Sequence, residues 1–136
     1  MGELKNKIMF IIQRPPYKSE CPKLGLTHSL ASGVTGIHID EDVVPTVAFV
    51  GDGILNCVKE QKSMDSYGIT SNETHVKNML LTDTKVLVCK EDLEILGIKE
   101  DRLIDASDMG AEVTINVVPF NEILKEMETN DHLMFF

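Results

Sequence analysis

The sequence predicts an α/β fold, in which helices flank a mainly parallel sheet of about five strands, and two observations lead to it. Short apolar runs of strand length alternate with segments of helical spacing along the whole chain. The first run, at residues 7–13, has the continuous apolar character of a strand that is covered on both faces. No internal repeat interrupts the 136 residues, so we expect a single domain over residues 1–136.

The first strand, residues 7–13, leads into two consecutive prolines. Pro15 and Pro16 lack backbone N–H donors and restrict φ, so the chain must turn at the carboxyl end of this strand. Apolar residues then recur at helical spacing. This spacing predicts a short helix over residues 23–32, interrupted by glycine.

Residues 45–50 form the second apolar run of strand length. It ends at Gly51, Asp52 and Gly53, residue types that tolerate unusual turns. Apolar residues from Ile54 onward indicate that a helix follows directly. A tight strand-to-helix turn is therefore expected here.

The middle of the chain contains a polar loop, two helices and the third strand. The loop is expected at residues 63–71, and Asn72 is expected to cap the helix that follows it. The third strand is predicted at residues 86–88. A helix over residues 91–96 should end at Gly97.

The last third of the chain contains the remaining two strands. Residues 102–111 read as irregular structure, and residues 113–118 predict a short strand. Asn121 is expected to cap the final helix. Residues 133–136 predict the last strand.

The net charge and hydropathy pattern exclude several classes of function. The formal net charge is -9 and no run of Lys and Arg occurs, so binding to nucleic acid or to an anionic membrane surface is not expected. The longest apolar stretch is too short to span a bilayer or to form the core of a signal peptide, and a cytoplasmic protein is expected. The sequence also lacks a GxSxG turn, a P-loop and a paired-carboxylate arrangement, which disfavours a hydrolase.

The cysteines and histidines do not form a metal or disulfide pattern. Three widely spaced cysteines are typical of individual thiols in a reducing compartment. The four histidines lack the i, i+4 pairing that a zinc site would need on a helix. A structural metal is therefore not expected, and the thiol chemistry considered below requires no organic cofactor. The cysteines are Cys21, Cys57 and Cys89.

Cys89 is the candidate catalytic residue, because it follows the third strand and precedes a helix. The positive end of a helix dipole stabilises a thiolate, the form that attacks or accepts sulfur. Two features favour a second interpretation, a small apolar core residue: unpaired cysteine is often buried, and Glu91 and Asp92 place negative charge nearby. Lys90 partly offsets those charges.

In a parallel sheet, the loops after the first three strands share one edge and could line one crevice around Cys89. Each loop also has a structural interpretation: the Arg-Pro-Pro-Tyr segment as a rigid connector, and Asp52 as a helix cap rather than a phosphate contact. Cys21 could approach the same crevice, whereas Cys57 is expected in the core. The candidate lining residues are Arg14, Pro16, Tyr17, Gly51, Asp52, Gly53 and Lys90.

Four landmarks along the chain together resemble the DsrE/DsrF-like sulfur-relay family, and especially its DsrF or TusC branch. They are a strand entering a Pro-Tyr loop at residues 11–17, an aromatic strand end with Asp-Gly at residues 49–54, a Val-Cys followed by a helix closing on Gly-Ile at residues 88–98, and a terminal hydrophobic strand after Asp131. The resemblance covers nearly the whole chain. It implies a flavodoxin-like three-layer fold.

The resemblance also implies a function and partners. Family members assemble into homo- or hetero-oligomers, trimers or hexamers, and some carry sulfur as a cysteine persulfide at the position that Cys89 occupies. The leading hypothesis is therefore a sulfurtransferase-like persulfide carrier that exchanges sulfur with donor and acceptor proteins. Two alternatives remain: a non-catalytic assembly subunit, and a small-molecule or nucleotide-binding module that uses the loops after the first two strands.

Overall fold

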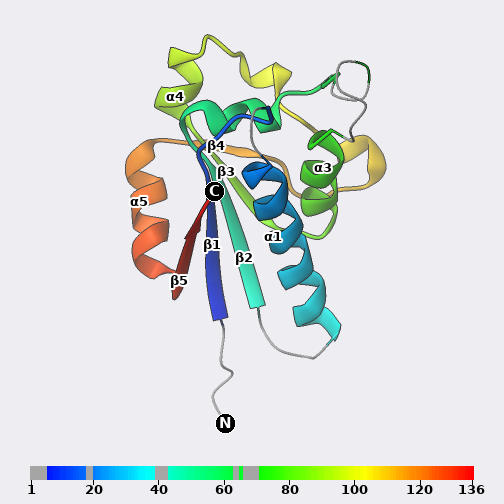
Figure 1. Ribbon diagram of the computed structural model, residues 1–136, viewed down its shortest axis with the longest axis vertical. Helices are drawn as coiled ribbons and strands as arrows, with labels where there is room; N and C mark the ends of the chain where they lie inside the picture. Colours follow the sequence, from blue (N-terminus) through cyan, green and yellow to red (C-terminus); the bar gives the residue numbers. More distant parts are fainter. Residues whose placement is uncertain (1–5, 18–19, 39–42, 63–64, 66–70) are drawn as a thin grey trace.

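The computed structural model describes residues 6–17, 20–38, 43–62, 65 and 71–136, and it contains a five-stranded sheet (Figure 1). The strand order is β4-β3-β2-β1-β5, and every neighbouring pair is parallel. The predicted α/β class is confirmed, and the sheet is parallel throughout. The strands are β1 (Asn6–Ile12), β2 (Val43–Phe49), β3 (Lys85–Cys89), β4 (Asn116–Val118) and β5 (His132–Phe135).

The core is built on the three central strands. Phe10 of β1 pairs with Val47 of β2, and Val47 in turn pairs with Val86 of β3; all three are fully buried. Burial of one such side chain stabilises the fold by roughly 1.5–3 kcal/mol relative to exposure. These strands are apolar on both faces because both faces are covered, which explains the continuous apolar runs in the sequence.

Helices cover the two faces of the sheet. The helices α1 (Cys21–His38) and α3 (Glu73–Leu81) pack against each other on one face, where the Phe10 ring contacts the His28 ring edge-on. The helix α5 (Phe120–Thr129) joins β4 to β5 and contacts β1 and β3. The connection from β4 to β5 crosses the sheet in the opposite direction from the earlier connections, so the right-handed crossover that is usual for parallel strands places α5 on the other face. Figure 1 shows α5 on the far side of the strands from α1 and α3.

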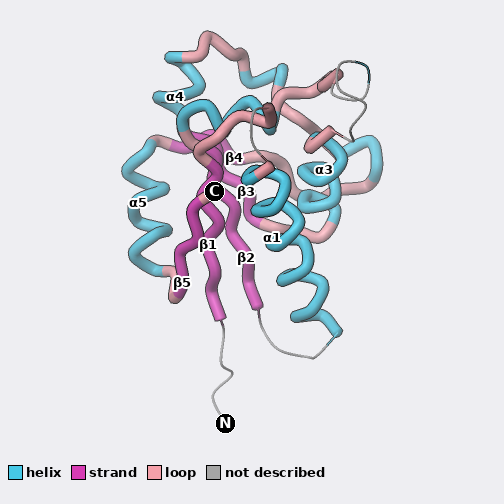
Figure 2. Tube along the Cα trace, viewed as in Figure 1, coloured by secondary structure: helices cyan, strands magenta, loops and turns pink. Residues whose placement is uncertain are grey.

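Short helical segments gather at the carboxyl ends of the strands. Figure 2 shows these segments and their loops above the sheet. They are the 3₁₀ helix η1 (Gly51–Cys57), the helix α4 (Lys90–Ile95), and the 3₁₀ turns η2 (Glu100–Arg102) and η3 (Ser107–Met109). This edge therefore carries the segments in which candidate functional residues were expected.

Several element boundaries differ from the predicted ones. The helix after the first loop runs well beyond residues 23–32, and the segment after β2 is a 3₁₀ helix. Of the strand predicted at residues 113–118, only the last three residues pair with β3. The predicted end at Gly97 is confirmed: its φ of 69° is left-handed, and its N–H donates to the Glu94 carbonyl at 3.0 Å. The loop expected at residues 63–71 lies mostly outside the described residues.

The three predicted caps do not form as expected. Asn72 occupies the predicted cap position of α3, but its side chain makes no capping hydrogen bond and donates to Asn56 instead. Pro119, not Asn121, occupies the cap position of α5. Asp52 lies inside the first turn of η1, after the cap residue Val50.

The strand order places the switch point of the sheet at β1. The chain adds β2, β3 and β4 on one side of β1 and β5 on the other, an order that differs from the 2-1-3-4-5 order of flavodoxin. Ligands of open α/β sheets bind most often at the switch point, here between β1 and β5. Cys89 ends β3, at the expected edge but two strands away from that point.

No helix in the described part of the chain is long and apolar enough to cross a membrane.

Candidate functional site

Cys89 occupies the junction predicted for it. It is the last residue of β3 and the N-cap residue of α4, with extended backbone angles (φ -69°, ψ 118°). The side chain is buried, at 1% exposure. The thiol therefore lies at a strand end and a helix start, but beneath the molecular surface.

The surroundings of Cys89 favour the neutral thiol. Burial is the largest cause and raises the pKa of Cys89, because a buried thiolate loses its hydration. The backbone N–H of Asp92 has the opposite effect, because it stabilises the thiolate. The carboxylate of Asp92, through hydrogen bonding and charge, and the charge of Glu91 raise the pKa further. The net shift is upward, so the positional advantage of the helix start does not produce a reactive thiolate in this conformation.

The two acidic residues next to Cys89 act as acceptors for backbone groups of other segments. The Asp92 carboxylate accepts the N–H of Gly51 at 2.8 Å, which joins η1 to α4. The Glu91 carboxylate accepts the N–H of Phe120, the first residue of α5, at 3.1 and 3.2 Å. Glu91 thus supplies the side-chain acceptor that the N-terminus of α5 otherwise lacks.

The loops after β1 and β2 are in close contact. A Cβ atom on Gly53 would lie 2.0 Å from the carbonyl oxygen of Ile12, so this position requires glycine. The side-chain amide of Asn56 donates to the Arg14 carbonyl at 2.9 Å. The loop after β2 therefore contacts the loop after β1, and it contacts the start of α4 through Gly51.

The guanidinium of Arg14 lies against a different thiol from the predicted one. Its Nη1 donates to the Sγ of Cys21 at 2.8 Å, where α1 begins. Cys21 is partly exposed, unlike Cys89. A neighbouring cation and a helix N-terminus are features that favour a reactive cysteine, so Cys21 joins Cys89 as a candidate reactive thiol.

The other predicted lining residues are spread along the same edge. Tyr17 is 43% exposed and Pro16 is partly buried in the loop after β1. Asp52 and Lys90 are exposed on η1 and at the start of α4. Cys57 is fully buried as expected, and burial raises the pKa of its thiol well above the ordinary value.

A buried polar network underlies this edge and was missed by the sequence analysis. Asn56 is fully buried; its Oδ1 accepts from Asn72 Nδ2 at 2.8 Å, and its Nδ2 donates to the Arg14 and Gly53 carbonyls. The Gln61 side chain donates to the Asn56 and Val58 carbonyls. The only available signal was an asparagine among apolar residues in a helical segment.

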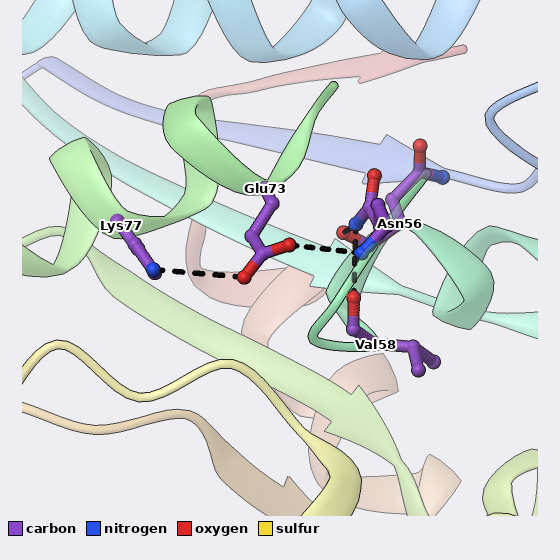
Figure 3. A network of polar contacts seen from close by, with 5 residues as sticks. Asn56, Val58, Glu73 and Lys77 are labelled. Carbon is purple, nitrogen blue, oxygen red and sulfur yellow. Dashed lines mark hydrogen bonds and ion pairs between the residues drawn. The ribbon is translucent and has the colours of Figure 1, made fainter. Parts of the chain in front are cut away.

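Glu73 continues this network to the surface. One of its carboxylate oxygens accepts the Gln61 N–H at 3.0 Å, and the other lies 3.5 Å from Lys77 Nζ (Figure 3). The first turn of α3 is thereby tied to the segment that follows η1.

Two open clefts lie beside this network, with volumes of about 320 and 310 Å³. Lys59 and Asp105 line both, whereas Cys89 lines neither. The larger cleft has an apolar floor that includes Leu103 and Ile115. No sequence motif marks these clefts, because their walls come from segments far apart in the chain.

Among the described residues, no group of three or more His, Cys, Asp or Glu side chains is placed to hold a metal ion.

Comparison with known proteins identifies one family. The model of the DsrE/DsrF-like family matches residues 6–136. No curated protein sequence gives a significant match.

Solved structures with similar folds cover nearly the whole chain. The ychN protein of E. coli is 16% identical, with a TM-score of 0.72 and coverage of 98% of this chain and 100% of that one. MTH1491 of Methanobacterium thermoautotrophicum is 16% identical (TM-score 0.63; coverage 96% and 99%), and BT1422 of Bacteroides thetaiotaomicron is 14% identical (TM-score 0.60; coverage 95% and 94%). The latter two are described as proteins of unknown function.

Proposed function

Because this chain belongs to the DsrE/DsrF-like family, and membership in this family suggests a role in sulfur relay, we propose that it carries sulfane sulfur as a persulfide on Cys89. The partners in this proposal are a persulfide donor protein, an acceptor thiol and sister subunits of the same family. The compartment is the reducing cytoplasm, in which single thiols persist.

The chemistry is a thiol–persulfide exchange. The Cys89 thiolate attacks the terminal sulfur of the donor persulfide, a new S–S bond forms at Cys89, and the S–S bond of the donor breaks. The donor leaves as a thiolate, which takes up the proton that Cys89 lost. Transfer to the acceptor repeats the same exchange, so no external oxidant or reductant is consumed.

The observation that carries the proposal is the position of Cys89. It ends β3 and immediately precedes α4, and the backbone N–H of Asp92 lowers its pKa, against the larger upward effect of burial. A persulfide on this residue would lie at the edge where the loops after β1, β2 and β3 contact one another.

A second candidate function, a supporting subunit without sulfur chemistry of its own, is favoured by a different observation. Cys89 is 1% exposed and its pKa is raised, as expected for a core thiol. Apolar side chains are exposed on α5 and β5, which suits packing against a sister subunit. They are Phe120, Leu124, Leu133 and Phe135, with exposures of 39–56%.

Mass spectrometry after incubation with glutathione persulfide tests the two candidates. The test uses a Cys21→Ser background, because Cys21 is partly exposed and could take up sulfur itself. The carrier function predicts one added sulfur atom in this background, mapped to the Cys89 peptide and lost when Cys89→Ser is added. No added sulfur on the Cys89 peptide, or equal labelling after Cys89→Ser is added, would contradict the carrier function and leave the supporting role.

A further inference from the structure

The contact between Asp92 and Gly51 joins two neighbouring loops at the carboxyl edge of the sheet. Asp92 lies in the first turn of α4, and Gly51 is the first residue of η1, 41 positions earlier in the chain. The Asp92 Oδ2 accepts the Gly51 N–H at 2.8 Å. Gly51 adopts a left-handed φ of 54°, a conformation that glycine permits readily.

This contact lies beside the buried thiol. Cys89 immediately precedes α4, and η1 packs against both β3 and α4. The Asp92 carboxylate also acts on the Cys89 thiol directly, by hydrogen bonding and by charge. One side chain therefore contacts the η1 backbone and influences the candidate sulfur-carrying atom.

We propose that Asp92 is a positioning residue that holds η1 against the first turn of α4 and thereby controls access to Cys89. The proposal rests on the carrier function proposed for Cys89. Release of the Asp92–Gly51 contact, for instance when a donor protein docks at this edge, would uncover the thiol. The buried Cys89 is then the closed state of the site.

Glu91 provides a matched comparison within the same helical turn. Its carboxylate also raises the pKa of Cys89, but its backbone partner is Phe120 of α5 rather than Gly51. The charged side chains that raise the pKa of Cys89 are those of Asp92 and Glu91, both on α4. Glu91→Ala removes one of these charges while leaving the contact to η1 in place.

Alkylation of Cys89 by iodoacetamide tests the proposal in a Cys21→Ser background, with peptide mapping to assign the modified cysteine. Asp92→Ala removes both the acceptor and the charge. We expect it to speed alkylation of Cys89 by about tenfold or more, the scale set by loss of a hydrogen bond to a charged group. Asp92→Asn removes the charge but keeps a side-chain acceptor for the Gly51 N–H. Access of iodoacetamide to Cys89 should therefore be about the same in this variant as in the parent protein.

The pH profile separates access from ionisation. Asp92→Asn and Glu91→Ala should both move the midpoint of the rate profile to lower pH, whereas Asp92→Ala should in addition raise the plateau rate, where the thiol is fully ionised. Circular dichroism and thermal unfolding check that each variant is folded. Equal plateau rates for Asp92→Ala, Asp92→Asn and Glu91→Ala would overturn the proposal.

The alkylation assay contains no sulfur donor, so its result is independent of the carrier function. Faster alkylation of Asp92→Ala together with no persulfide on any variant would retain the positioning role and reject sulfur transfer. Persulfide formation on wild type, together with equal plateau rates of alkylation for all variants, would retain sulfur transfer and reject the positioning role.

Discussion

The Arg14 guanidinium donates a hydrogen bond to the Cys21 sulfur, with 2.8 Å between Nη1 and Sγ. This contact joins the loop after β1 to the first residue of α1. It places a cation at a partly exposed thiol, whereas the thiol at the end of β3 is buried beside two carboxylates. The two cysteines at this edge of the sheet therefore differ in both access and electrostatic surroundings.

We predict that Cys21 is the most rapidly alkylated cysteine of the native protein. Exposure and a neighbouring guanidinium both favour reaction, so its rate should exceed that of Cys89 by about tenfold or more. Arg14→Ala should slow Cys21 several-fold, and Lys90→Ala, which removes an exposed cation elsewhere on this edge, should not. Equal rates for Cys21 in wild type and Arg14→Ala would show that the guanidinium does not activate it.

Gly53→Ala should destabilise the protein. The new Cβ would lie 2.0 Å from the Ile12 carbonyl oxygen, so η1 or the end of β1 must move, at a cost of roughly 1–3 kcal/mol or more. Urea unfolding measures the change. Gly110→Ala is the comparison: open space surrounds its Cβ position, so only the cost of its left-handed φ of 95° remains. A smaller loss at Gly53 than at Gly110 would contradict the close approach.

Asn56→Ala should be strongly destabilising, because it leaves its buried partners without hydrogen bonds. Loss of a buried partner costs about 1–3 kcal/mol for each group left unsatisfied. Asn72→Ala should cost less, since Asn56 retains its two carbonyl acceptors. Urea unfolding of both variants and of the double variant gives the coupling energy, which should be clearly nonzero for residues in contact.

Asp105 should titrate below the ordinary range of an aspartate. The backbone N–H and the hydroxyl of Ser107 both donate to its carboxylate and lower its pKa, with the charge of Lys59 adding to the effect. Its stabilising effect is therefore present above the unfolded-state pKa and is lost as pH falls through the lower folded-state value. NMR titration of the carboxyl carbon should show a higher pKa in Ser107→Ala. An unchanged value would exclude the hydroxyl hydrogen bond as a cause, because the backbone N–H of residue 107 remains in this variant.

The fold was predictable because its signals are local. The apolar runs at residues 7–13 and 45–50 mark strands covered on both faces, and Gly97 ends a helix through its own backbone conformation. The strand predicted at residues 113–118 is longer than the observed one, because only the last three of these residues pair with a neighbouring strand.

The candidate site was predictable in position but not in environment. The strand-to-helix pattern placed Cys89 at the end of β3, as observed. Its burial could not be read from the sequence, because it depends on how η1 and α4 pack. The sequence predicts that Glu91 and Asp92 act on Cys89 through their charge. Their hydrogen bonds to the backbone of Phe120 and Gly51 could not be predicted, because these partners lie 29 and 41 positions away in the chain.

The sequence by itself determined the α/β alternation, the strand that ends at Cys89 and the resemblance to a sulfur-relay family. Periodicity and the order of motifs can be read along the chain without knowing which residues are in contact. Only the tertiary structure decided which thiol is exposed and which is buried. It also decided that Asp92 holds η1, that Arg14 lies against Cys21 rather than Cys89, and that Asn72 binds Asn56 instead of capping its helix. Hydrogen bonding and burial depend on distance in space, and chain folding sets those distances between residues that are remote in sequence.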